Sequence, residues 1–255
     1  MRIVTLLAAT AFGLAGIQAA SAADMGLPLK APPPPPPAWT WTGFYIGGNA
    51  GAGYGQVDQQ LNFPGPGFGP MAFDSQPISG FLGGAQLGYN WQMPNAPVVL
   101  GIEGEWDWAG LSGTAPCNLN FFGAIVGMNC NVQENWIADV AGRIGFTADR
   151  ALIYVKGGVA WTQNNYNATL LPLAVQIPAT ASETKVGGLL GVGVEYAIMG
   201  NWSAKVEYDF IDFGSSTNTI NVAGGAIPPS IVNVGVRETV SEVKFGINYR
   251  WNWAP

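Results

Sequence analysis

The sequence predicts an all-β protein, an eight-stranded antiparallel transmembrane β-barrel with up-and-down meander topology. Eight stretches alternate apolar and polar residues with a period of two, which is typical of strands with unlike faces. Their connections alternate between long and short, as in a membrane barrel with turns at one end and loops at the other. Charged residues make up only 10% of the 255 residues, well below the roughly 25% of soluble domains. A soluble barrel would have an apolar interior, and the outward face expected here is too apolar for that class.

The segment before the barrel is predicted to direct export. Residues 1–22 have a positive start at Arg2, an apolar stretch over residues 3–17 and small residues before position 23, which is the pattern of a signal peptide. Residues 23–38 contain six consecutive prolines and are predicted to form an extended periplasmic spacer. A ligand for a periplasmic partner is the alternative, but no flanking charge marks a recognition motif. The barrel domain then covers residues 39–255.

Four strands are predicted in the first half of the barrel, at residues 39–55, 79–92, 98–108 and 135–147. The first begins with the tryptophans Trp39 and Trp41 and continues rich in glycine. In the third, Leu100 and Ile102 share a face opposite Glu103 and Glu105. This alternation indicates strands with one lipid-facing side and one polar side.

Four further strands are predicted at residues 151–164, 184–198, 202–210 and 239–251. The middle two form the clearest hairpin, because only Met199, Gly200 and Asn201 separate them, and such residues tolerate positive φ. Glycines and charged residues share the polar face of this hairpin. Small residues on that face favour a narrow barrel interior, where side chains are crowded.

The long connections are predicted to be loops at residues 56–77, 109–133, 165–183 and 215–237. The second of them holds both cysteines of the chain. In an exported protein we expect Cys117 and Cys130 to form a disulfide, which would contribute about 3 kcal/mol on the chain-entropy model. A redox or metal role is the alternative, but the spacing is not CxxC and the chain has no histidine.

Charged residues on the polar faces are expected inside the barrel as an ion network. Its predicted members are Glu103, Glu105, Asp139, Arg143, Lys156, Glu195, Lys205, Glu207, Lys244 and Arg250. Paired carboxylates also serve in acid–base catalysis, but both signs of charge share this interior and buried charges must be paired. We predict no catalytic residue, metal site or cofactor. The inward glycines, including Gly88, Gly158 and Gly191, leave open the alternative of a thin water path.

Seven tryptophans are predicted to form two aromatic belts at the membrane interfaces. Trp91, Trp202 and Trp251 fall at the ends of strands beside the short turns, and Trp106, Trp108, Trp136 and Trp161 fall toward the long connections. Outer-membrane lipid is therefore the expected surrounding. No basic stripe suggests a nucleic-acid partner, and the net charge is −6.

Several segments resemble the small opacity-type, porin-like outer-membrane β-barrel proteins of alphaproteobacteria. They are residues 41–48 (WTGFYIGG), 142–145 (GRIG), 154–160 (YVKGGVA), 193–196 (GVEY), 201–208 (NWSAKVEY) and 248–250 (NYR). The resemblance implies an eight-stranded barrel in the bacterial outer membrane that the barrel-assembly machinery inserts. Such chains usually end on an aromatic residue after Asn-Tyr-Arg; here Trp251 or Trp253 would serve. Some relatives bind haemin, although this chain lacks histidine.

Three functions follow as hypotheses. The first is a structural envelope protein that makes surface contacts through its long external loops. The second is a narrow porin-like channel for small solutes, or a surface binder of a haemin-type ligand. The third, an outer-membrane enzyme, has the least support, because no histidine is present to complete a catalytic constellation. Nothing in the sequence identifies a partner for the loops.

Overall fold

The structure is a computed structural model that describes residues 39–62, 71–72, 75–117, 119–121, 124–170, 175–224 and 227–251. The predicted signal peptide and spacer, residues 1–38, lie outside the described residues, as does Trp253. The domain that begins at Trp39 is described by itself below. Among the described residues, no helix is long and apolar enough to cross a membrane.

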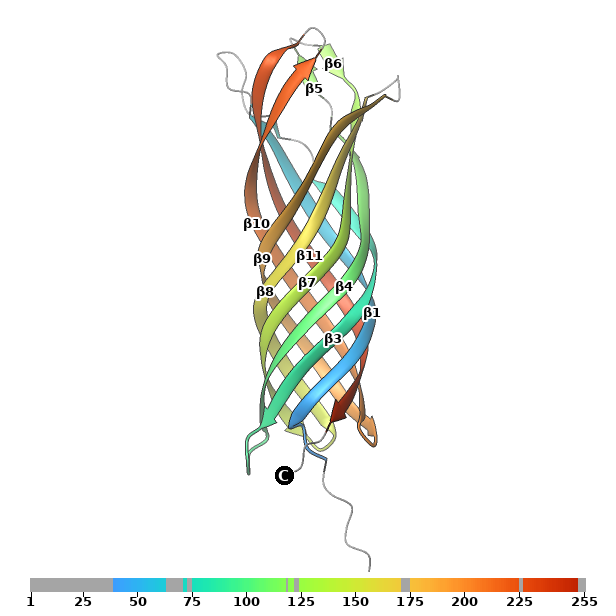
Figure 1. Ribbon diagram of the computed structural model, residues 1–255, viewed down its shortest axis with the longest axis vertical. Coiled ribbons are helices and arrows are strands. Elements are labelled where there is room, and N and C mark those ends of the chain that lie inside the picture. The colour runs from blue at the N-terminus through green and yellow to red at the C-terminus, as the bar shows by residue number, and fades with distance from the viewer. Residues whose placement is uncertain are drawn as a thin grey trace, which may run out of the picture. The chain divides into compact units, whose positions relative to one another are not determined.

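Eight antiparallel strands form a closed barrel (Figure 1). They are β1 (Gly43–Asn62), β3 (Gln76–Gln92), β4 (Val98–Pro116), β7 (Met128–Ala148), β8 (Ala151–Leu170), β9 (Val175–Met199), β10 (Trp202–Gly224) and β11 (Ile227–Trp251). Each pairs with the next along the chain, and β11 pairs with β1 to close the ring. The short strand β2 (Met71–Ala72) pairs with β1, and β5 (Leu119–Phe121) pairs with β6 (Ala124–Val126). The predicted eight-stranded meander is confirmed.

The closing pair β1–β11 runs in continuous register from Phe44 opposite Trp251 to Asn62 opposite Asn233. In the part near the turns, closure leaves every strand paired on both sides, which is the condition for placing strand backbone in hydrocarbon. Farther toward the external end, the described residues of β9 and β10 no longer pair with each other beyond Gly188 and Asp212. Because β11 ends at Trp251, opposite the start of β1, this tryptophan is the aromatic residue at the end of the described last strand.

Short turns lie at the end of the barrel where β1 begins and β11 ends (Figure 1). They join β3 to β4, β7 to β8 and β9 to β10. Asn95, Asp149 and Gly200 adopt positive φ in these turns, at 59°, 53° and 55°. Asn, Asp and Gly tolerate this left-handed conformation, so the turn residues fit their positions. In outer-membrane barrels the end with short turns is the periplasmic end.

The prediction of four long loops is wrong for most of the residues concerned, because they continue the strands. Strand β1 continues to Asn62, β4 to Pro116, β8 to Leu170 and β10 to Gly224. A transmembrane strand needs only about 9–11 residues, so strands of 17 to 25 residues extend well past the membrane on the external side. Polar composition suggested loops there, but β8 continues to pair with β9, and β10 with β11, so these strand pairs satisfy backbone hydrogen bonds of each other.

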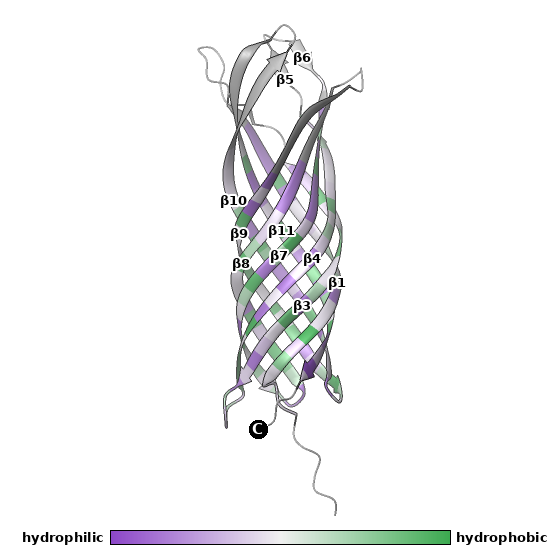
Figure 2. Cartoon of the chain, in the orientation of Figure 1, coloured by the Kyte–Doolittle hydropathy of each residue, from purple (hydrophilic) through white to green (hydrophobic). Residues whose placement is uncertain are grey.

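The polarity of the wall inverts along the barrel axis. Near the turns, large apolar side chains such as Ile102 and Phe245 face outward, 57% and 62% exposed, and charged side chains face inward. Toward the external end, Gln56 and Ser112 face outward, whereas apolar side chains fill the interior. Figure 2 shows green and purple alternating along the strands in the part near the turns. The external part therefore follows the rule of a soluble β-barrel, and the part near the turns follows that of a membrane barrel.

Candidate functional site

The candidate site is a network of charged side chains in the barrel interior, which we call the central network. Six strands, β4 and β7 to β11, contribute to it, because alternate residues of each strand point inward. Its members are Glu103, Glu105, Asp107, Asp139, Arg143, Lys156, Glu195, Lys205, Glu207, Asp209, Glu242, Lys244 and Arg250. None is more than 4% exposed. The structure thus places all ten residues of the predicted network in one buried layer.

Arg143 connects the periplasmic side of the network. Its two terminal nitrogens lie 3.4 Å from Glu103 Oε2 and 3.4 Å from Glu195 Oε2, and its Nε donates to Asn90 Oδ1 at 2.8 Å. The guanidinium also lies over the rings of Tyr45 and Tyr154, 4.7 and 5.0 Å from their centroids. A planar guanidinium can stack and form ion pairs at the same time, so this position suits arginine better than lysine.

Lys205 fills a cage of three carboxylates. Glu103, Glu105 and Glu207 bring ligand oxygens within 4.8 Å of one another, a spacing that could hold a metal ion. The ammonium of Lys205 lies 3.2, 3.4 and 3.3 Å from oxygens of these same residues. An ammonium has three donors, so one lysine satisfies all three carboxylates. The cage is therefore an internal ion-pair site and not a free metal site.

Two further lysines link the network toward the external side. Lys156 Nζ lies 2.8 Å from Glu207 Oε1 and 2.9 Å from Asp209 Oδ2. Lys244 Nζ lies 2.9 Å from Asp209 Oδ2, and it also contacts Glu105. Because Asp209 and Glu207 are shared between lysines, the ion pairs join four strands into one connected unit.

Inward glycines make room for the long side chains of the network. A Cβ on Gly246 would lie 3.0 Å from Cγ and Cε of Lys205, and one on Gly191 would lie 2.9 Å from the same atoms of Lys156. At Gly193 the ring of Tyr154 occupies the equivalent space. At Gly191 and Gly193, neighbouring side chains occupy the space that the glycines leave.

Both ends of the central network are covered. On the periplasmic side, Trp41 is 1% exposed and the guanidinium of Arg250 lies 4.5 Å from the centroid of its ring. On the external side lies a cluster that we call the apolar layer. It consists of Val57, Ile78, Leu82, Ala109, Leu111, Val132, Ile137, Ala141, Ala160, Leu189, Ile211, Phe213, Val236 and Val240. Within it, Lys185, Asn164 and Glu238 form a smaller buried polar group.

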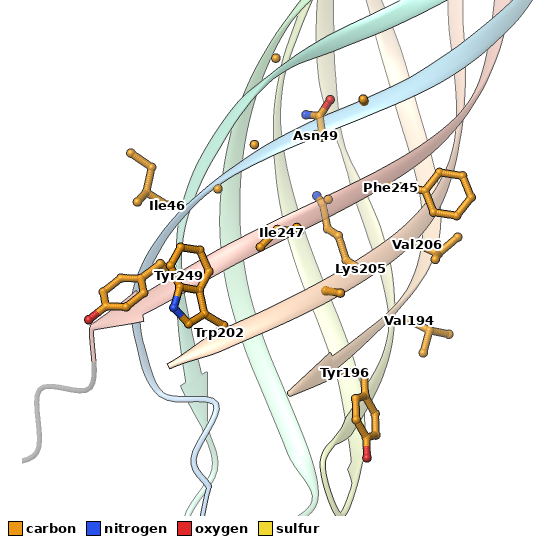
Figure 3. Close-up of a pocket in the computed structure, with 16 residues that line it drawn as sticks. Ile46, Asn49, Val194, Tyr196, Trp202, Lys205, Val206, Phe245, Ile247 and Tyr249 are labelled. Atoms are coloured by element: carbon orange, nitrogen blue, oxygen red, sulfur yellow. The ribbon is translucent and has the colours of Figure 1, made fainter. Parts of the chain in front are cut away.

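A hollow on the outer wall is separate from this interior (Figure 3). Outward side chains of β1, β9, β10 and β11 line it, among them Ile46, Val206 and Phe245, with Trp202 and Tyr249 on the side near the turns. Lys205 points to the opposite side of the same wall and belongs to the central network. Most of the lining residues are apolar, although Asn49 and Lys205 are among them, and the outward apolar side chains belong to the lipid-facing surface.

The outer membrane protein β-barrel domain family matches residues 6–237 of the chain. The chain belongs to this family. The resemblance to alphaproteobacterial outer-membrane barrels is thereby confirmed, and so is the location in the bacterial outer membrane.

Relatives of the chain agree with this family. The chain is 30% identical over 213 residues to the 31 kDa outer-membrane immunogenic protein of Brucella melitensis, covering 82% of this chain and 83% of that protein. It is 27% identical over 136 residues to the 22 kDa outer membrane protein of Rhizobium leguminosarum, covering 53% and 54%. The outer membrane protein OprG from Pseudomonas aeruginosa matches with a TM-score of 0.48 and 12% identity, over 82% of this chain and 97% of that one. The names of these relatives describe outer-membrane proteins and not enzymes.

Of the seven tryptophans predicted to form belts, five are exposed on the outward face and two are partly buried. Trp91, Trp202 and Trp251 are 42%, 48% and 50% exposed at strand ends near the turns. Trp106 and Trp108 are 40% and 64% exposed farther along β4. Trp136 and Trp161 are partly buried, and the indole nitrogen of Trp136 donates to Gln163.

The predicted list of network members omitted Asp107, Asp209 and Glu242, although the strand alternation placed them on the inward face. The apolar layer and the polar neutral partners of the network were not predicted. Among the latter, Tyr45 donates to Glu103 at 2.7 Å and Tyr154 donates to Glu207 at 2.6 Å. The available signal was the inward parity of both tyrosines on their strands. Glycines on the neighbouring strands, Gly88 and Gly193, give the two rings space.

The two cysteines are joined at the external end of the pair β4–β7. The Cys117–Cys130 disulfide has a Cα–Cα distance of 5.7 Å. Cys130 belongs to β7 and pairs with Ala115 of β4, so the bond lies at the end of a strand ladder. The prediction that both cysteines lie in a loop is therefore wrong for Cys130. Gln76 of β3 also donates to the carbonyl oxygen of Cys130, at 3.1 Å. The disulfide therefore closes the segment that carries β5 and β6.

We expect the variant Cys117→Ser to expose the segment between residues 118 and 127 to protease while the barrel remains folded. The bond closes a short connection at the end of the ladder, and the strands below it stay paired. Limited proteolysis followed by mass spectrometry would locate the cuts, and gel migration without heating would report the folded barrel. The variant Ser112→Ala, on the outward face of β4, is the control. Loss of the folded barrel in Cys117→Ser would contradict this expectation.

Proposed function

We propose that this outer-membrane barrel is a closed, non-catalytic protein that supports the integrity of the envelope and makes surface contacts through its external connections. The observation that carries this proposal is the packing of the interior. A water-filled channel would leave its lining accessible, whereas the ion-paired side chains of the central network are at most 2% exposed. Eight strands enclose a space that side chains can fill, whereas open porins use 16 to 18 strands.

The apolar layer supports a closed barrel independently of the ion network. Leu111 and Ile211 are fully buried, and they lie on the external side of the charged network residues of β4 and β10. An ion that crossed this layer would exchange much of its hydration for contacts with apolar side chains, which is costly. A narrow channel for small solutes would therefore need a change in this layer.

The non-catalytic part of the proposal rests on the pairing of the acidic residues. The carboxylates of Glu103, Glu105, Glu207 and Asp209 all contact lysines and are shielded from solvent. Substrate has no access to such groups. Outer-membrane lipid on the apolar wall and the assembly machinery during insertion are the partners that this proposal includes.

Planar-bilayer recordings on the refolded full chain would test the closed state. We expect no stable porin-like conductance from the wild type, because both the network and the apolar layer block the interior. A double variant Leu111→Gly and Ile211→Gly removes two side chains from the apolar layer, and Leu87→Gly with Ile102→Gly is a matched control on the lipid face. Stable, large conductance in the wild type would overturn the closed barrel.

A deletion strain would test the envelope role separately. Sensitivity to detergent should rise on deletion, and the wild-type chain should restore resistance. A chain in which Gly-Ser replaces residues 118–127 should restore resistance equally, since it keeps the barrel, but should lose contacts made by the β5–β6 hairpin. Unchanged detergent sensitivity in the deletion strain would count against the envelope role.

A further inference from the structure

The central network contains more acids than bases. Among the residues that the structure describes, it holds five cations and eight carboxylates, and none is more than 4% exposed. The cations are Arg143, Lys156, Lys205, Lys244 and Arg250. The carboxylates are Glu103, Glu105, Asp107, Asp139, Glu195, Glu207, Asp209 and Glu242. If every group were ionised, the network would carry three uncompensated negative charges, and buried charges without partners are costly. Glu134, Glu238 and Lys185, also buried, would add one further negative charge to the interior.

The excess gathers at the external side of the network, around Lys244. Its Nζ lies 3.6 Å from Asp107, 2.9 Å from Asp209 and 3.3 Å from Glu242, and it also contacts Glu105. One ammonium has three donors, so it cannot satisfy four carboxylates. Asp139 forms no ion pair within 4.0 Å with any described residue, although it is only 4% exposed.

The strand register brings acids directly opposite one another. Glu105 of β4 is paired with Asp139 of β7, and Asp209 of β10 is paired with Glu242 of β11. Like charges at directly opposite positions are destabilising. Four of these carboxyl oxygens are buried without a hydrogen-bond partner and without an ion pair: Asp107 Oδ1, Asp139 Oδ1, Asp209 Oδ1 and Glu242 Oε1. A proton on a neighbouring carboxyl group would supply the donor that such an oxygen lacks.

We propose that three carboxyl groups of the central network hold protons in the folded barrel at neutral pH. One belongs to the pair Glu105 and Asp139, one to the pair Asp209 and Glu242, and the third is on Asp107. This assignment makes the formal charge of the network zero and turns each pair of opposed acceptors into a donor and an acceptor. Metal ions are a poorer explanation, because Lys205 already occupies the carboxylate cage and both ends of the network are covered.

The protons link the stability of the barrel to pH. Carboxyl groups in an unfolded chain are ionised at neutral pH, so unfolding would release three protons. Raising the pH then favours the unfolded chain, by up to about 1000-fold in the unfolding equilibrium constant per pH unit. The effect disappears in strong acid, where the unfolded chain binds the same protons. The free energy of unfolding of the barrel would therefore fall as the pH rises above neutral.

Infrared spectroscopy on the refolded full chain in detergent micelles tests the proposal directly. Protonated carboxyl groups have a C=O stretching band that carboxylates lack, and we expect this band in the folded wild type at pH 7. Asp139→Asn and Glu242→Gln should each weaken it, whereas Asp58→Asn, at an exposed position of β1, should leave it unchanged. Absence of the band from the folded wild type at pH 7 would overturn the proposal, whether or not the variants fold.

Urea unfolding between pH 6 and 9 provides the second measurement. In the wild type, the unfolding equilibrium constant should rise by up to about 1000-fold per pH unit. In Asp139→Asn this rise should be about tenfold smaller per pH unit, because the pair of Glu105 and Asp139 then has no proton to release on unfolding. Repeating the series with added sodium or magnesium separates protons from bound cations. Stability that follows the cation concentration and is indifferent to pH would show that cations, and not protons, neutralise the network.

Discussion

Replacing Lys244 by methionine is expected to destabilise the barrel by about 3–5 kcal/mol, the usual cost of removing one partner from a buried ion pair. Lys244 is fully buried and contacts Glu105, Asp107, Asp209 and Glu242. Methionine keeps most of the volume, so the effect reports the lost charge and not a cavity. Urea unfolding of the refolded protein, followed by heat-modifiable migration on gels, would measure the change.

Arg237→Met is the matched control for this prediction. Arg237 lies on β11 as well, and its side chain is 60% exposed beside Asp212, at 3.6 Å. An exposed pair contributes less than about 1 kcal/mol, so this variant should unfold nearly as the wild type does. Equal destabilisation by the two substitutions would contradict the view that the network holds the barrel together from inside.

The second large effect is expected from Gly158→Ala on β8, which should prevent or strongly impair folding. A Cβ at this position would lie 2.6 Å from Cα and 2.8 Å from Cβ of Ala141 on the neighbouring strand β7. The obstruction includes backbone, so β7 and β8 would have to separate. Overpacking of this kind costs about 1–3 kcal/mol, and forced separation of paired strands adds to it.

Gly157→Ala, one residue earlier, separates this effect from the loss of a flexible residue. The position faces outward, and a Cβ there would make ordinary contacts, 3.5 Å from Cδ2 of Leu190 and 3.8 Å from the carbonyl oxygen of Leu189. We expect Gly157→Ala to fold with nearly wild-type yield, measured as the fraction of heat-modifiable protein after refolding. A similar loss of yield at both positions would mean that backbone freedom, and not interior space, explains the glycines.

Strand alternation was sufficient to predict the eight-stranded meander and the inward position of the charged residues. Lys205 and Glu207, for example, are inward because they share a parity on β10. The partners of each charge could not be predicted in this way, because they depend on the stagger between strands that are distant in the sequence. Lys205 and Glu105, for instance, are 100 residues apart in the chain.

The apolar layer was not predicted, because in this part of the strands the inward and outward faces exchange their polarity. Leu111, Val132 and Val236 fall within stretches predicted as loops. In those stretches the apolar residues are inward and the polar ones outward, which is the reverse of the pattern in the strands near the turns. A search for a single pattern with apolar residues outward recognises only the membrane-spanning part of each strand.

The inverted polarity of the external wall has a consequence for biogenesis. Strands enter the outer membrane from the periplasm, so the external part of each strand must cross the hydrocarbon before it reaches its final position. Its outward residues include Gln56, Asp58 and Arg237, and an arginine at the midplane costs about 2–4 kcal/mol on the lipid face. The same strands carry their apolar side chains on the inside, where water is present until the barrel closes. The same side chains that suit the external part in its final position are therefore unfavourable while it crosses the bilayer. A catalyst that thins the bilayer or shelters the strands would lower this energy barrier to insertion.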